Sequence, residues 1–116
     1  MLLALLVKSD AHHARAQRLF EAMEEPVAVP YAVLLEVCWV LQRATKDFAF
    51  IAESARLITE RFTVVFEESE LAGNAVSRYA REFDQFSLVD CELIEWKKTA
   101  GFDVVTFDQG LEERLR

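Results

Sequence analysis

The sequence contains few of the residues that interrupt regular secondary structure. Among 116 residues there are only three glycines and two prolines. This composition leaves little room for long irregular loops, and it predicts short connections between helices and strands. A chain of this length can bury a core without disulfides or metal ions to hold it together. We therefore expect a single domain over residues 1–116.

Clustered cysteines, long apolar runs and excess positive charge are also missing. Cys38 and Cys91 lie far apart and outside any CxxC motif, so we interpret both as reduced, buried hydrophobic residues. No apolar run reaches the roughly 18 residues that span a bilayer, which predicts a cytoplasmic protein without membrane contact. The net charge of −7 argues against a broad basic surface for nucleic acid. It does not exclude an enzyme that meets phosphates through bound cations.

Patterns typical of strands and helices alternate along the chain. The apolar segments expected to form strands are residues 27–29, 62–66 and 103–107. The segments expected to form helices are residues 11–23, 31–43, 48–60, 69–82, 87–98 and a short one from 108 to 116. Asp47 is expected to cap one of these helices, and Gly101 to end another in the left-handed conformation. The alternation predicts an α/β fold with parallel strands and right-handed crossovers.

One predicted helix is apolar on every side and yet contains a carboxylate. Residues 31–41, YAVLLEVCWVL, leave no polar stripe at the helical period, so the helix and Glu36 are expected to be buried. A buried carboxylate is costly unless it has a partner. Two partners are consistent with the pattern: a Lys or Arg side chain in a structural salt bridge, or a cation in a metal or catalytic site. The third alternative is a glutamate at the rim of the core, half exposed to water.

Two further acids are expected near the sheet edge at which parallel strands end. Asp108 follows the strand at 103–107, and Asp90 lies in the first turn of the helix that Ser87 opens. Glu36 lies about two turns into its own helix and can point toward the same edge. Three acids at one edge repel one another unless a cation such as Mg²⁺ or Mn²⁺ holds them together. Such a site suits phosphodiester hydrolysis, with Thr106 and Ser87 as hydroxyl groups that orient the carboxylates.

Each of these acids also has a purely structural interpretation. The spacing of Ser87 and Asp90 is close to a capping box, and Asp108 is well placed to cap the last helix. Glu36 would then form a salt bridge with one of three arginines: Arg43, Arg81 or Arg114. Under this interpretation the chain is a plain α/β domain without a metal site.

Three segments, in this order, resemble the PIN domain, most closely the small VapC-type toxins of bacterial and archaeal toxin–antitoxin pairs. They are PYAVLLEVCWVL, FSLVDCELIEWKKTAG and DVVTFDQGL, and the resemblance runs over nearly the whole chain. It implies a three-layer α/β/α sandwich with a short parallel sheet, and a Mg²⁺- or Mn²⁺-dependent endoribonuclease. By the same resemblance Glu36, Asp90 and Asp108 match acidic metal-site positions. The implied partners are the RNA substrate, a second copy in a homodimer, and a protein antitoxin whose basic residues reach the acidic pocket.

The resemblance is incomplete at the N-terminus. Family members open with a hydrophobic strand ending in Asp-x-Asn and followed by an apolar helix, whereas Met1–Leu6 matches only that helix. The central first strand and the first metal aspartate are therefore expected to be missing. We expect strand rearrangement, a partner chain or residues lost through a misplaced start codon to close the gap. The alternative function is a catalytically impaired PIN-like module that binds an antitoxin or RNA without cleaving.

Overall fold

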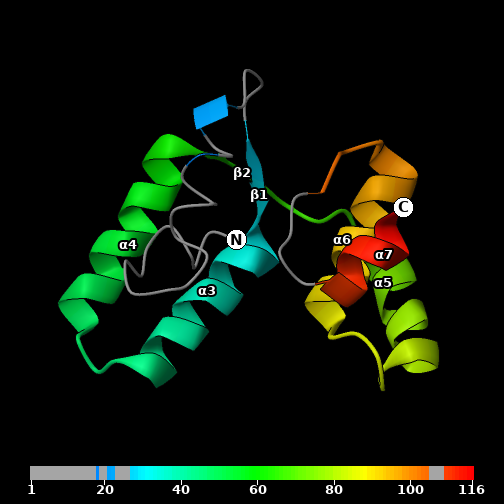
Figure 1. Cartoon of the computed structure of the whole chain (residues 1–116), viewed down its shortest axis with the longest axis horizontal. Helices are drawn as coiled ribbons and strands as arrows, with labels where there is room; N and C mark the ends of the chain where they lie inside the picture. The colour runs from blue at the N-terminus through cyan, green and yellow to red at the C-terminus, as the bar shows by residue number, and fades with distance from the viewer. Residues whose placement is uncertain (1–17, 19–20, 23–26, 105–108) are drawn as a thin grey trace. The chain divides into compact units, whose positions relative to one another are not determined.

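The computed structural model describes residues 18, 21–22, 27–104 and 109–116. The chain divides into two compact units, residues 1–66 and 67–116, and each is described by itself (Figure 1). The described elements of the first unit are β1 (Ala28–Pro30), α3 (Tyr31–Ala44), α4 (Phe48–Arg61) and β2 (Thr63–Val65). Those of the second unit are α5 (Ser69–Glu82), α6 (Leu88–Ala100) and α7 (Gln109–Leu115).

Strands β1 and β2 pair in parallel and form a two-stranded sheet. Their register joins Val29 to Val64, and the amide of Thr63 donates a hydrogen bond to the carbonyl oxygen of Val27 at 3.1 Å. The connection between the strands runs through α3 and α4 (Figure 1). The predicted α/β class with a short parallel sheet is confirmed, and the helical connection is long enough for the crossover that parallel pairing requires.

The third predicted strand and the first predicted helix fall largely outside the described residues. Asp103 and Val104 are described and are not part of a strand, whereas residues 105–107 lie outside the described ranges. Arg18, Glu21 and Ala22 are helical, as expected for the segment from 11 to 23. The expected absence of a first strand and the closure of the resulting gap concern residues outside the described ranges, and both stay predictions. None of the described helices is long and apolar enough to cross a membrane.

The core of the first unit lies where α3 and α4 meet β1. Its buried residues are Val29, Leu34, Val37, Leu41 and Ile58. The three from α3 recur at a helical spacing of three and four residues, which places them on one face of the helix. The first turn of α4 is capped as predicted, because Asp47 Oδ1 accepts a hydrogen bond from the amide of Phe50 at 3.1 Å.

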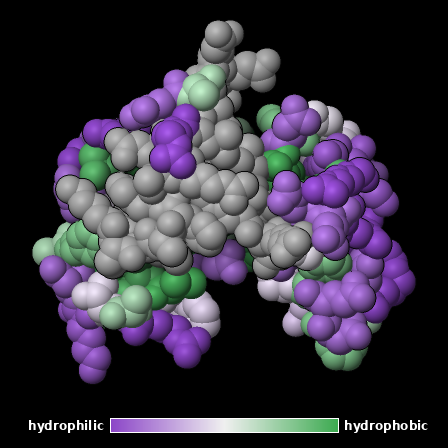
Figure 2. All heavy atoms as spheres, viewed as in Figure 1, coloured by the Kyte–Doolittle hydropathy of each residue, from purple (hydrophilic) through white to green (hydrophobic). Residues whose placement is uncertain are grey.

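The prediction that α3 is buried on every side is wrong. Tyr31, Leu35 and Trp39 are 40%, 53% and 56% exposed, and their spacing of four residues aligns them along one side of the helix. Hydrophobic residues are visible at the surface among polar ones (Figure 2). The physical reason is that a surface helix buries only the face turned to the core, and an apolar residue on its other face stays exposed. Glu36 lies between the two faces and is partly buried.

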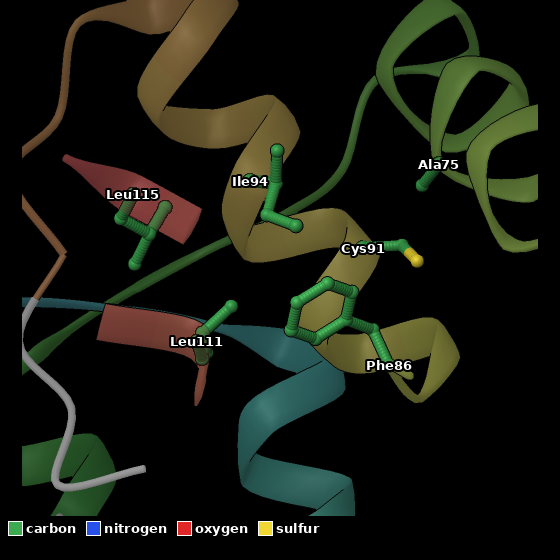
Figure 3. Packing of buried hydrophobic residues seen from close by; sticks show 6 residues of the cluster. All are labelled: Ala75, Phe86, Cys91, Ile94, Leu111 and Leu115. Carbon is green, nitrogen blue, oxygen red and sulfur yellow. The ribbon is translucent and has the colours of Figure 1, made fainter. Parts of the chain in front are cut away.

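The second unit is built on three helices with regular ends. Ser87 caps α6, and Gly101 ends it with φ of 72°, the left-handed conformation predicted for this glycine. The buried hydrophobic residues of this unit are Ala75, Phe86, Cys91, Ile94, Leu111 and Leu115 (Figure 3). They come from α5, α6, α7 and the turn before α6, so one core holds all three helices together.

Both cysteines are reduced, as predicted. Cys91 is fully buried, and burial raises the pKa of its thiol, with the negative charge of Glu82 acting in the same direction. Cys38 is only partly buried on α3, so the prediction that both cysteines are buried is wrong for this residue. A thiol that is buried and protonated behaves as a small hydrophobic side chain, which agrees with its expected role.

Candidate functional site

Glu36 lies on α3 at the boundary between the core and the surface. Its neighbour Val37 is buried and its neighbour Leu35 is exposed, while Glu36 itself is partly buried. Two of the arginines considered as its salt-bridge partners make other contacts. Arg43 lies over the ring of Trp39, with the guanidinium carbon 4.8 Å from the ring centroid. Arg114 pairs with Glu82 at 2.8 Å.

Asp90 and Ser87 form the capping box that their spacing predicts. The amide of Asp90 donates to Ser87 Oγ at 3.1 Å, and the amide of Ser87 donates to Asp90 Oδ2 at 3.2 Å. These bonds hold the carboxylate of Asp90 at the start of α6. Among the described residues none donates a hydrogen bond to the second oxygen, Oδ1. The cap and a metal ligand are therefore compatible roles for one side chain.

The convergence of the three predicted acids stays a prediction. Asp108 and Thr106 lie outside the described residues, and Glu36 and Asp90 belong to different units. Within the described ranges, no group of three or more His, Cys, Asp or Glu side chains is close enough to hold a metal ion. Asp108 is not one of the residues to which this statement applies.

A pair of neighbouring acids in the second unit, Glu67 and Glu92, was not predicted from the sequence. Glu92 lies on α6, two residues after Asp90, and forms a hydrogen bond with Glu67. Burial, this hydrogen bond and the negative charge of Glu67 together raise the pKa of Glu92 to about 7. Its Oε2 atom is buried and has no hydrogen-bond partner among the described residues. The signal available in the sequence was a single acid within the apolar run CELI, the same signal that drew attention to Glu36.

The raised pKa of Glu92 predicts a loss of stability as the pH rises. The folded state binds the proton more tightly than the unfolded state, so stability present below about pH 4.5 is lost as the pH rises to about 7. Solvent screens the partly exposed side chain, so we expect a loss of about 1–2 kcal/mol. Glu92→Gln is expected to remove this loss, which urea unfolding at pH 4.5, 6 and 8 will measure.

The matched control for Glu92 is Glu113→Gln, which changes an exposed glutamate on α7. Other carboxylates titrate in the same range, so the informative quantity is the difference in unfolding free energy between variant and parent. That difference should grow with pH for Glu92→Gln and stay constant for Glu113→Gln. A constant difference for Glu92→Gln would show that its carboxyl group titrates alike in the folded and unfolded states.

The most deeply buried charges lie between α5 and α6. Arg78 and Glu95 are each 6% exposed. Arg78 Nε donates a hydrogen bond to Glu95 Oε1 at 2.9 Å, Nη2 lies 2.8 Å from the same oxygen in an ion pair, and Nη1 donates to Glu82 Oε2 at 3.3 Å. Glu95 is therefore a buried acid with a salt-bridge partner, whereas Glu36 is only partly buried. Sequence inspection missed it because the two partners are 17 residues apart and belong to different helices.

Comparison with known families gives a match over almost the whole chain. Residues 1–114 match the family model of the PIN domain. The chain belongs to the PIN domain family. This PIN domain is also similar in fold to the crystal structure of VapC20 of Mycobacterium tuberculosis, a toxin that cleaves the sarcin-ricin loop. The TM-score is 0.83 at 23% identity, and the similarity covers 97% of this chain and 88% of VapC20. A comparison with curated proteins found no match.

The acids of this PIN domain suit a hard divalent cation by their chemistry. Glu36 and Asp90 are both partly buried, and carboxylate oxygens are the ligands that Mg²⁺ and Mn²⁺ prefer. The capping box uses Oδ2 of Asp90 and holds the carboxylate in one orientation, which reduces the cost of ordering it around a cation. Among the described residues, the soft ligand next to Asp90 in the sequence is the thiol of Cys91. This thiol is buried and protonated, and a protonated thiol does not bind a metal ion.

Proposed function

We propose that this PIN domain is a metal-dependent endoribonuclease of a toxin–antitoxin pair. The observation that carries the proposal is the family match over residues 1–114, and the fold similarity to VapC20 supports it. In this proposal Glu36, Asp90 and Asp108 together hold Mg²⁺ or Mn²⁺, and the reaction is hydrolysis of RNA phosphodiester bonds. The cation would lower the pKa of the attacking water and neutralise charge that develops on the phosphate.

The chain's own residues contribute orientation and charge. The amide of Ser87 fixes one oxygen of Asp90 through the capping box, so the other oxygen points in a defined direction. We propose that the hydroxyl groups of Ser87 and Thr106 orient the carboxylates further. Glu36 projects from the boundary of the α3 core face, which restricts its movement more than full exposure would. A negatively charged site of this kind repels RNA until a cation is bound.

We further propose the partners that accompany this activity. The substrate is RNA, and the protein acts in the cytoplasm as a homodimer. A protein antitoxin would block the site by placing basic residues near the carboxylates. The net charge of −7 supports a basic partner segment, because opposite charges accelerate association and favour the complex. The alternative is a catalytically impaired module that keeps its antitoxin or RNA without cleaving it.

The test is Mn²⁺ binding measured by calorimetry, followed by cleavage of RNA with and without a chelator. The parent is compared with Glu36→Gln and Asp90→Asn, and circular dichroism establishes that each variant is folded. The matched control is Asp84→Asn, which makes the same change at an exposed position in the turn after α5. We expect the parent and Asp84→Asn to bind Mn²⁺ and cleave RNA, and both site variants to lose binding and cleavage.

Two other results would contradict the proposal in different ways. A folded parent that neither binds Mn²⁺ nor cleaves RNA would select the impaired binding module. Binding that is unchanged in both Glu36→Gln and Asp90→Asn would mean that these acids serve only as a cap and a structural charge. In that case the cation binds elsewhere on the chain.

A further inference from the structure

We propose that the buried Arg78–Glu95 pair is a positioning element that fixes the register of α6 against α5. Through α6 it also sets the place of Asp90, at the start of the same helix. The consequence for the metal site rests on the proposed function, whereas the register itself is a property of the second unit. Neither Arg78 nor Glu95 is proposed to touch the cation or the RNA.

The contacts of Arg78 are directional and come from two helices. Its guanidinium group donates one hydrogen bond to Glu95 on α6, reinforced by a second close ion-pair contact, and one to Glu82 at the end of its own helix. Glu82 in turn forms an ion pair with Arg114 Nη2 on α7 at 2.8 Å. The two arginines and two glutamates form an electrically neutral network that joins all three helices. The guanidinium group of Arg78 is a planar fork of donors that pairs with carboxylates in only a few orientations. The network therefore defines how the helices pack against one another.

The apolar contacts between α5 and α6 are less directional than these hydrogen bonds. Ala75 on α5 and Cys91 and Ile94 on α6 belong to one buried cluster (Figure 3). Apolar contacts depend on buried area and shape rather than on the direction of a bond, so they restrict the register of the two helices less than paired charges do. A buried ion pair generally stabilises a protein no more than a well-packed apolar pair would. The directional character of Arg78–Glu95 is therefore its distinguishing contribution.

A change of register would reach the candidate metal ligand directly. Glu95 lies five residues after Asp90 on one continuous helix, a separation of about 7.5 Å along its axis. Because the helix moves as a rigid element, a slip by one residue would shift Asp90 by about 1.5 Å and turn it by about 100°. Catalytic groups lose most of their effect when they are misplaced by about 1 Å. Arg114 extends the same restraint to α7, which begins directly after Asp108 in the sequence.

The test replaces both partners by apolar residues of similar size, Arg78→Met with Glu95→Leu. Removing both charges leaves neither one buried and unpaired, so this variant is expected to stay folded. The matched control is Arg56→Met with Glu53→Leu, the same changes in an exposed ion pair on α4. Amide hydrogen exchange, resolved by segment, and Mn²⁺ titration are measured on the folded full chain.

We expect exchange in residues 88–95 to become about tenfold faster in the Arg78/Glu95 variant, with exchange in α3 and α4 unchanged. The Mn²⁺ dissociation constant should rise about tenfold, as it does when groups that orient a metal ligand are removed. A purely stabilising role would speed exchange in proportion to the lost stability, but it would leave the Mn²⁺ dissociation constant unchanged in a protein that remains folded. The control variant should match the parent in both measurements.

A folded Arg78/Glu95 variant with the parent's exchange rates and Mn²⁺ affinity would overturn the inference. If this variant does not fold, Arg78→Lys keeps the charge without the fork of donors, and unchanged exchange in residues 88–95 would overturn the inference equally. If the parent binds no Mn²⁺, the proposed function fails, and the exchange rates alone decide whether the pair fixes the register. The two failures are thus distinguishable.

Discussion

Replacing Arg78 alone by methionine is expected to lower the free energy of unfolding by about 3–5 kcal/mol. The side chain is 6% exposed, and its removal leaves Glu95, also 6% exposed, as a buried negative charge without its arginine. Glu82 loses one of its two arginine partners at the same time. Small domains are stable by only about 5–15 kcal/mol, so this variant should unfold at a much lower urea concentration.

The control for Arg78→Met is Arg56→Met on α4. Arg56 also bridges two glutamates, Glu53 and Glu60, but all three side chains are about half exposed. Water solvates the remaining carboxylates there, so we expect a much smaller change in the free energy of unfolding. Urea unfolding of both variants, followed by circular dichroism, makes the comparison. Equal small losses of unfolding free energy in the two variants would show that burial does not increase the contribution of Arg78 to stability.

Leu41→Ala is expected to destabilise the protein by about 2–5 kcal/mol. Leu41 is 1% exposed, and it packs in the core that α3 forms with β1 and α4. Truncation removes buried methyl groups and leaves a cavity, because neighbours such as Ile58 can only partly move into the space. Thermal and urea unfolding measure the loss. A value below about 1 kcal/mol would mean that this core rearranges to fill the cavity.

The matched control is Leu35→Ala, which makes the same change on the same helix at a side chain that is 53% exposed. Most of the Leu35 side chain already contacts solvent, so we expect a change within about 0.5 kcal/mol. The comparison therefore tests whether the buried and the exposed face of α3 also differ in their contribution to the free energy of unfolding. A large loss of unfolding free energy in Leu35→Ala, measured at a protein concentration too low for association, would indicate that the chain itself covers this face.

Helix boundaries were predictable because their signals are local. Asp47 and Ser87 accept hydrogen bonds from amides three residues later, and Gly101 adopts a positive φ directly after its helix. Each of these interactions involves residues within one turn of the chain, so the residue type and its spacing are sufficient to predict it. The remaining differences are small: Ser87 caps α6 rather than forming its first turn, α3 and α4 end one residue later than predicted, and α6 ends two residues later.

The candidate site was predictable in part. The interpretation of Ser87 and Asp90 as a capping box is confirmed, and the roles of Glu36, Asp90 and Asp108 as metal ligands stay a prediction. Glu36 is partly buried, rather than fully buried as predicted. Glu95 is more deeply buried than Glu36, and its partner comes from a helix that sequence spacing does not relate to it. A single sequence contains no information on such a pairing.

The sequence by itself determined, to within one or two residues, where α3 to α6 begin and end, that the segments around Val29 and Val64 form strands, and therefore the α/β class. These properties depend on hydrogen bonds and backbone conformations within a few residues. Only the tertiary structure decided which face of α3 is covered, that Arg78 pairs with Glu95, and that Glu67 shifts the pKa of Glu92. Burial and charge pairing depend on distances between residues remote in sequence, and folding alone brings those residues together.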